Sequence, residues 1–225
     1  MTKMTNLIVP ILLTFNGGFV DTAGFLGLQG LFTAHVTGNF VTLAATLLMG
    51  THGVLAKLLA LPEFAIVVAF ARVAGSAMRA RGLPALPILL TIKVSFLLAF
   101  LILAVAFGPF PDSDAPTALL AGFAGVAAMA VQNAVQRVHF ASLPPTTLMT
   151  GNTTQAVLDA VDLIAGSERD DVPVVRARLG RLLRGIVWFA AGCAAAAILY
   201  HWLGFWCLIV PVGAGATTAI LHRKE

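Results

Sequence analysis

Long stretches almost free of charged side chains recur along this sequence, and they restrict its fold more than any other feature. Only hydrocarbon hides so much apolar surface, because a water-soluble chain of 225 residues needs polar groups to cover its exterior. Charged residues make up 11% of the chain, against about a quarter in ordinary soluble domains. The sequence therefore predicts an all-α integral membrane protein embedded in a lipid bilayer.

Six stretches are long enough to cross a bilayer as helices of about 20 residues. They are 7–30, 62–79, 86–108, 117–139, 184–200 and 203–221. Two further apolar segments, 38–49 and 152–165, are too short to cross at about 1.5 Å per residue. We predict that these two are re-entrant segments or half-helices.

Basic residues indicate the orientation, because cytoplasmic loops retain Lys and Arg during insertion. Six spans with both short segments re-entrant place the N- and C-termini in the cytoplasm. That side then receives Lys3, Arg79, Arg81, Arg169, Arg176, Arg178, Arg181, Arg184, Arg223 and Lys224, and the outside receives Lys57, Asp112 and Asp114. If both short segments crossed instead, Arg79 and Arg81 would face outward, which disfavours that alternative.

The chain repeats an internal motif. Residues 33–39 and 146–152 are identical at four of seven positions, including the triplet Thr-Gly-Asn. In each case a helix with polar residues precedes the motif and a short apolar helix follows it. Three spans per half is an odd number, so the sequence predicts two inverted-topology repeats, 1–110 and 111–225.

Both triplets stand at the start of a predicted half-helix inside the membrane. Thr and Asn are suited to capping the first N–H groups of a helix, and helix starts carry partial positive charge. Two opposed starts would suit a small polar or anionic solute. The candidate substrate-binding residues are Asn16, Asp21, Thr37, Gly38, Asn39, Gln132, Asn133, Thr150, Gly151 and Asn152. The alternative is that each triplet only caps a helix in an interfacial loop.

Several charged residues lie in or beside predicted spans. Asp21 needs a cation, a proton or several donors if it is buried, so it is either a proton- or cation-coupling group or a structural partner of a basic side chain such as Arg72. Lys93 and Arg137 lie close enough to helix ends to extend to the interface. His35 has no neighbouring ligands in the sequence and is weak evidence for metal or proton chemistry.

Other classes of function find no support in the sequence. The basic residues are not interleaved with aromatics as in nucleic-acid-binding proteins. Cys193 and Cys207 fall in apolar runs, and no nucleotide-binding loop, nucleophile motif or cofactor motif is present. We expect no enzyme activity, cofactor or metal. A homodimer is expected, with the small-residue stretch 190–197 available for helix contact.

Several motifs together resemble the YoaK family of bacterial inner-membrane proteins. They are Gly18-Phe19-Val20-Asp21, Gly30-Leu31-Phe32, Val36-Thr37-Gly38-Asn39, Val131-Gln132-Asn133-Ala134 and Met149-Thr150-Gly151-Asn152. The resemblance implies a multi-pass protein of the bacterial inner membrane and marks Asp21 and the triplets as signature positions. It supplies no substrate, since the family is a domain of unknown function.

Two functions are consistent with these patterns. The leading hypothesis is a small-solute transporter or channel whose two halves meet at a polar midplane site. The alternative is a membrane scaffold, sensor or assembly factor that transports nothing.

Overall fold

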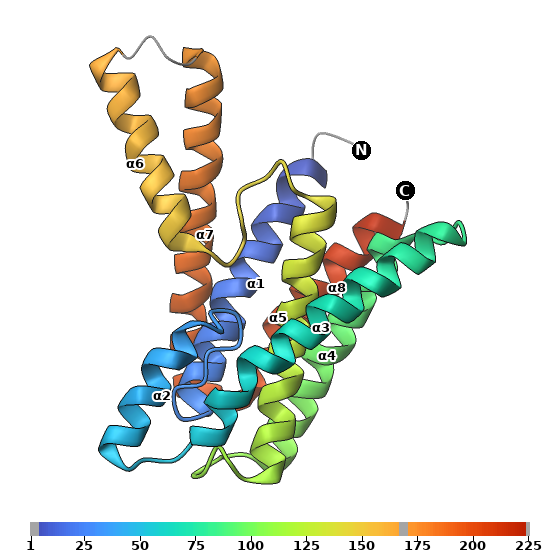
Figure 1. The fold of residues 1–225 in the computed structure, drawn as a ribbon, viewed down its shortest axis with the longest axis vertical. Helices are drawn as coiled ribbons and strands as arrows, with labels where there is room; N and C mark the ends of the chain where they lie inside the picture. Colours follow the sequence, from blue (N-terminus) through green and yellow to red (C-terminus); the bar gives the residue numbers. More distant parts are fainter. Residues whose placement is uncertain (1–4, 167–170, 224–225) are drawn as a thin grey trace.

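The structure is a computed structural model that describes residues 5–166 and 171–223. These residues form helices joined by short connections, with no strand among them (Figure 1). In chain order the elements are α1 (Thr5–Gly27), α2 (Gly38–Met49), α3 (Val54–Ala80), α4 (Ala85–Phe107), α5 (Pro116–His139), α6 (Met149–Ala165), α7 (Val172–Leu203), η1 (Gly204–Leu208) and α8 (Ile209–Arg223). The all-α prediction is confirmed for this part of the chain. Lys3, Arg169 and Lys224, used in the topology argument, lie outside it.

Five helical segments have the length and apolar composition of membrane spans. They are Ile8–Gly27, Val54–Ala80, Ala85–Phe107, Pro116–His139 and Val172–His222. The last segment contains two helices, α7 and α8, with the short 3-10 helix η1 between them. In Figure 1 the chain turns back at η1, so that α8 ends near the start of α1.

Helix α3 begins at Val54, eight residues before the predicted span, because a distant carboxylate caps it. Asp114, in the connection between α4 and α5, accepts hydrogen bonds from the backbone N–H groups of Gly53, Val54 and Ala56 at 3.2, 2.9 and 2.9 Å. A carboxylate at this position satisfies the free N–H groups of a helix start and complements its dipole.

Helix α7 begins at Val172, twelve residues before the predicted span. The arginine-rich run therefore belongs to a helix and is not a loop. Arg178 in this part of α7 donates from Nε and Nη2 to the Asp159 carboxylate of α6, at 2.9 and 2.7 Å. Figure 1 shows α6 and the first half of α7 side by side, extending beyond the other helices.

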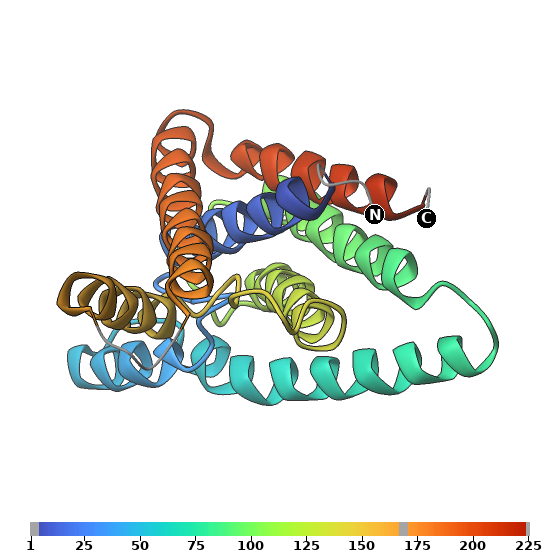
Figure 2. The same ribbon diagram turned by 90° about the horizontal axis from the view of Figure 1, so that it is seen from above.

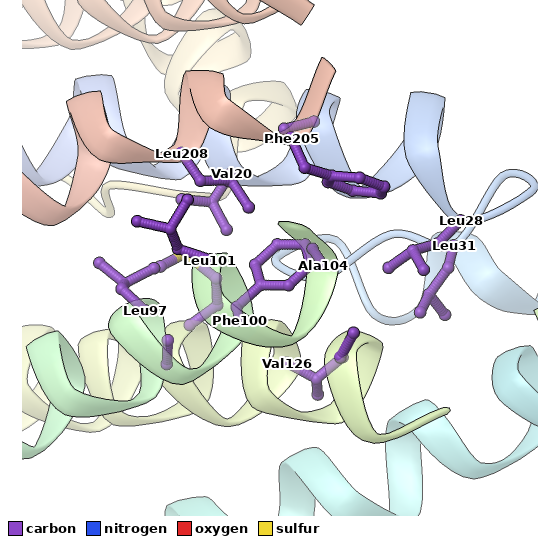
Figure 3. Close-up of a cluster of buried hydrophobic side chains, with 14 of the residues drawn as sticks. Val20, Leu28, Leu31, Leu97, Phe100, Leu101, Ala104, Val126, Phe205 and Leu208 are labelled. Carbon is purple, nitrogen blue, oxygen red and sulfur yellow. The ribbon is translucent and has the colours of Figure 1, made fainter. Parts of the chain in front are cut away.

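Helices α1 and α5 form the interior of the bundle. In their spanning windows 61% and 78% of the residues are buried, compared with 22% in α3. Figure 2 shows α5 between α3 on one side and α1 and α4 on the other. Figure 3 shows part of the hydrophobic core, in which Val20, Phe100, Val126 and Phe205 bring together α1, α4, α5 and η1.

The contact between α1 and α7 depends on glycines that let the two backbones approach. A Cβ on Gly18 would collide with the carbonyl oxygen of Phe189, and a Cβ on Gly192 would collide with that of Phe15. Small residues allow such close packing between membrane helices. Gly192 and Ala196 are buried, so part of the stretch expected to be available for a homodimer is already covered within the chain.

Helix α2 matches the predicted short segment 38–49. Its 12 residues span about 18 Å, and the 17 residues of α6 about 25 Å, both less than the roughly 30 Å of bilayer hydrocarbon. In Figure 1 the two helices start near the middle of the molecule and run in opposite directions, α6 toward the top of the view and α2 toward the bottom.

We expect Gly192→Ala to destabilise the protein by about 1–3 kcal/mol, because the added methyl forces α1 and α7 apart. Gly185→Ala on the same helix is the matched control, since nothing lies within 4 Å of a Cβ there. It should leave stability unchanged or raise it by about 0.5–1 kcal/mol through helix propensity. Thermal unfolding of the purified protein in detergent, followed by circular dichroism, measures both. Equal effects of the two substitutions would contradict the close-packing account.

Candidate solute-binding site

A cavity of about 440 Å³ lies between α3, α5 and the connections that lead into α2 and α6. Polar side chains and a larger number of apolar ones line it. The polar lining consists of His35, Thr37, Arg72, Asn133 and Arg137, and the apolar lining of Ala34, Val36, Leu61, Phe64, Val68, Ala134, Val138 and Leu148. The volume is in the range of small-molecule sites. Because Thr37 and Leu148 directly precede α2 and α6, the cavity adjoins the starts of both short helices.

Asp21 fixes the connection between α1 and α2. Its Oδ1 accepts hydrogen bonds from the backbone N–H groups of Ala34 and His35, at 2.7 and 3.2 Å. Its Oδ2 lies 2.7 Å from Nδ1 of His35. Asp21 therefore does pair with a basic side chain, but the partner is His35 and not Arg72.

The hydrogen bond to Asp21 raises the pKa of His35 above its usual value, although burial acts in the opposite direction. His35 lies in the connection between α1 and α2, outside the spanning helices. A positive charge on this imidazole is thus favoured at the edge of the cavity.

The asparagines of the two triplets hold the connections that precede them. Asn39 donates from Nδ2 to the carbonyl oxygen of Phe32 at 2.8 Å, and Asn152 donates from Nδ2 to that of Pro145 at 2.8 Å. In both bonds the acceptor lies seven residues before the asparagine in the sequence. Asn39 also accepts, through Oδ1, from the backbone N–H of Phe32 at 2.9 Å.

The expectation that the triplets cap their helices is wrong. The N-cap residues are Thr37 for α2 and Leu148 for α6, and neither makes a side-chain cap hydrogen bond. The asparagine side chains are instead turned back toward the preceding connection. The first N–H groups of both helices are therefore not taken up by a capping side chain.

Three polar residues of α1 and α5 also act between segments. Asn16 is buried and donates to the carbonyl oxygen of Pro211 in α8 at 3.0 Å. Gln132 is buried and donates to the carbonyl oxygen of Leu13 at 2.8 Å and to Thr146 Oγ1 at 3.1 Å. Asn133 accepts from Thr147 Oγ1 at 2.8 Å. Among these three, Asn133 alone lines the 440 Å³ cavity.

The two triplets do not line the same cavity. Thr37 lines the cavity described above, whereas Gly151 and Asn152 line a second one of about 390 Å³ between α6, α7 and the connection before α6. Leu148 lines both. Gly38 and Asn39 do not line the first cavity, and Thr150, which is exposed, lines neither.

Two residues that sequence reasoning placed elsewhere belong to the first cavity. Arg72 of α3 and Arg137 of α5 both line it, and neither forms a hydrogen bond or ion pair with any residue in 5–166 or 171–223. The sequence signal for Arg72 was its depth within a span. Arg137 lies near a helix end, and extension of its side chain to the membrane interface was sufficient to explain its position. The sequence therefore offered no reason to place it in the cavity.

Among the described residues, no group of three His, Cys, Asp or Glu side chains is arranged to hold a metal ion.

Helices of membrane-crossing length around a partly polar cavity define a multi-pass helical membrane protein. Within that class, the chain belongs to the DUF1275 family, a family described as protein of unknown function, which matches residues 9–221. The YoaK proteins are members of this family, so the resemblance seen in the motifs is confirmed. No curated protein and no solved structure matches the chain.

We predict that the ion pair between His35 and Asp21 makes stability depend on pH. Because the pKa of His35 is raised in the folded state, the pair stabilises fully below the unfolded-state value of about 6.5 and loses this effect as pH rises through the folded-state value. The stability difference between the wild type and Asp21→Asn should therefore be largest below about pH 6.5 and shrink as the pH rises above that value. Thermal unfolding across that range measures it, with His35→Gln as the background in which the trend disappears. A difference that is constant with pH would refute the pairing.

Asn39→Ala should destabilise the protein more than Asn152→Ala, because it leaves both a donor and an acceptor of Phe32 unpaired. Each lost buried partner costs about 1–3 kcal/mol. Thr153→Ala is the control, since its hydroxyl bonds only to Met149 O within the same helix and is exposed. Chemical or thermal unfolding in detergent gives the order. A loss of stability for Thr153→Ala as large as that for Asn39→Ala would contradict the role of Asn39 in holding the connection before α2.

Proposed function

We propose that this protein is a small-solute transporter or channel of the bacterial inner membrane, with both termini in the cytoplasm and two inverted repeats, 1–110 and 111–225. The observation that carries the proposal is the 440 Å³ cavity, which lies among spanning helices, adjoins the starts of both short helices and has polar side chains in its wall. Polar groups at membrane depth are costly and are retained mainly where they serve a solute or ion. Irregular backbone at such depth is tolerated where it lines a cavity.

The contacts between helices support the inverted repeat. Exchanging α1 with α5, α2 with α6, α3 with α7 and α4 with α8 maps most of the contacts between these helices onto one another, although the α3–α4 contact has no α7–α8 counterpart among the described residues. The α1–α7 contact becomes α5–α3, α2–α3 becomes α6–α7, α1–α8 becomes α5–α4, and α4–α8 is unchanged. The matching hydrogen bonds of Asn39 and Asn152 follow the same exchange.

Two features support six crossings with cytoplasmic termini. The start of α1 and the end of α8 lie at the same end of the molecule in Figure 1, as an even number of crossings requires. The end of α3 and the first half of α7, which are rich in arginine, lie toward that end in Figure 1, and positive residues are retained on the cytoplasmic side. In this arrangement, α2 and α6 are half-helices that enter from opposite faces.

The Asp21–His35 pair is the proposed coupling element in this function. The sequence placed the coupling proton on Asp21, but its carboxylate already accepts three hydrogen bonds. His35 lines the cavity and exchanges a proton close to physiological pH. We therefore assign the transferable proton to His35 and the role of holding the imidazole to Asp21.

A non-transporting scaffold, sensor or assembly factor is the alternative. The broad apolar surface of the half-helices favours it, since Val41, Leu48 and Ile164 are exposed and would suit a partner in the membrane as well as lipid. A homodimer through the same surface is compatible with either function.

The proposed function predicts flux through the cavity in proteoliposomes. Release of glycerol, glycine, acetate and benzoate should exceed that of protein-free vesicles for at least one solute. Phe64→Trp, which narrows the cavity by enlarging one side chain of its wall, should slow that flux roughly tenfold. Ile66→Trp on the same helix is the control, because Ile66 is 69% exposed and lines no part of the cavity. The flux of the same solutes is measured for Asp21→Asn and Asn39→Ala and compared with that of the wild type.

Flux for none of these solutes, from vesicles that contain folded protein, would favour the scaffold function. Equal slowing by Phe64→Trp and Ile66→Trp would show that the solute does not pass through this cavity.

A further inference from the structure

We propose that the cavity between α3 and α5 binds an organic anion, a carboxylate with a small apolar body, and that Arg72 and Arg137 receive the carboxylate group. This inference rests on the proposed function, since it names the class of solute that would occupy the same cavity.

The first argument is uncompensated charge. Arg72 and Arg137 each bring a permanent positive charge to the cavity, and no Asp or Glu lines it. Neither guanidinium has an ion pair or hydrogen bond within the described residues. The nearby carboxylate of Asp21 is already shared between two backbone N–H groups and His35. A negative group supplied by a ligand would complete the site.

The second argument is geometry of donors. The two guanidiniums come from different helices, and each presents a planar fork of N–H groups suited to two oxygens. His35 in its protonated form adds a further donor, because its Nδ1 donates to Asp21 and its other ring nitrogen has no partner among residues 5–166 and 171–223. Asn133 is partly engaged, since its nitrogen donates to the carbonyl oxygen of Met129 and its oxygen accepts from Thr147 Oγ1, which leaves one N–H of its amide for a ligand.

The third argument is the rest of the wall. Leu61, Phe64, Val68, Val138 and Leu148 make most of it apolar. Apolar surface contributes nothing to the recognition of a hydrated inorganic anion, but it stabilises the hydrocarbon part of an organic acid. A volume of about 440 Å³ also exceeds what a small inorganic ion fills. The combination favours a branched or aromatic carboxylate over sulfate or phosphate.

The other source of an anionic group is the lipid headgroup, because arginines near helix ends also bind lipid phosphates. The two sources differ in what they require. A carboxylate ligand needs both arginines and the apolar wall between them, whereas lipid phosphate needs only an accessible guanidinium.

The test is equilibrium binding to the full-length protein in nanodiscs made only of phosphatidylcholine. Ligand-observed NMR or calorimetry is used with benzoate and isovalerate, their neutral amides benzamide and isovaleramide, and sulfate. We expect both carboxylates to bind, and the amides and sulfate to bind at least about tenfold more weakly. Benzoate should be displaced by isovalerate, since both occupy one site.

Variants locate the site. Arg72→Gln and Arg137→Gln should each weaken benzoate binding at least about tenfold, and Arg137→Lys should fall between wild type and Arg137→Gln because it keeps the charge but loses the fork. Arg79→Gln is the matched control on α3, because Arg79 does not line this cavity and should leave binding unchanged. Thermal unfolding of each variant checks that the fold is retained.

Benzamide binding as tightly as benzoate, sulfate binding as tightly as benzoate, or unchanged benzoate affinity in Arg72→Gln and Arg137→Gln would each overturn the proposal. The proposal would also be overturned if the two arginine variants retained less anionic lipid than the wild type during purification but bound benzoate as well as the wild type does. Binding of benzoate without any flux would disprove transport and leave this inference intact. Flux of neutral solutes that neither arginine variant affects would support transport and overturn this inference.

Discussion

Backbone polar groups at membrane depth must find partners within the protein, and this requirement explains the most distinctive side chains of the chain. Each short helix is preceded by an irregular connection whose N–H and C=O groups cannot pair with one another as they do in a helix. Asp21 and Asn39 satisfy the first connection, and Asn152 satisfies part of the second. In the second half, Gln136 also donates to the carbonyl oxygens of Phe140, Leu143 and Pro144. The signature positions therefore hold the interrupted segments in place, and the cavity is a consequence of that arrangement.

The same arrangement depends on how closely the neighbouring helices pack. Gly18 and Gly192 allow α1 and α7 to touch along their backbones, which fixes α7 relative to the connection that Asp21 holds. On the other side, α3 reaches α5 with larger side chains such as Leu61, Phe64 and Arg72, and this looser contact encloses the cavity. Close packing on one side and loose packing on the other thus come from residue size at equivalent helix contacts.

Composition and periodicity were sufficient to predict the helical membrane character and the short helix α2, because these depend on local apolar pattern, and the family resemblance came from short motifs. They failed where the determining partner is distant in sequence. The start of α3 depends on Asp114, about 60 residues away, and that of α7 coincides with an ion pair to Asp159 on another helix. Lys93 was expected to extend to the interface, yet it is fully buried, because that face of α4 packs inside the bundle. The triplets were located correctly as the starts of short helices, but the capping function assigned to them from residue type was wrong.

The segments before the two Thr-Gly-Asn triplets differ in chemistry. The triplets are 113 residues apart, so Ala134 stands where Asp21 does, and Leu148 stands where His35 does. The acidic residue and its imidazole partner are thus both missing from the second half, as expected if neither is useful without the other, since a buried unpaired carboxylate or imidazolium is costly. Their replacements, Ala134 and Leu148, line the same cavity. The asymmetry therefore confines the Asp21–His35 pair to one half of the chain, whereas both halves contribute an arginine and apolar side chains to the cavity wall.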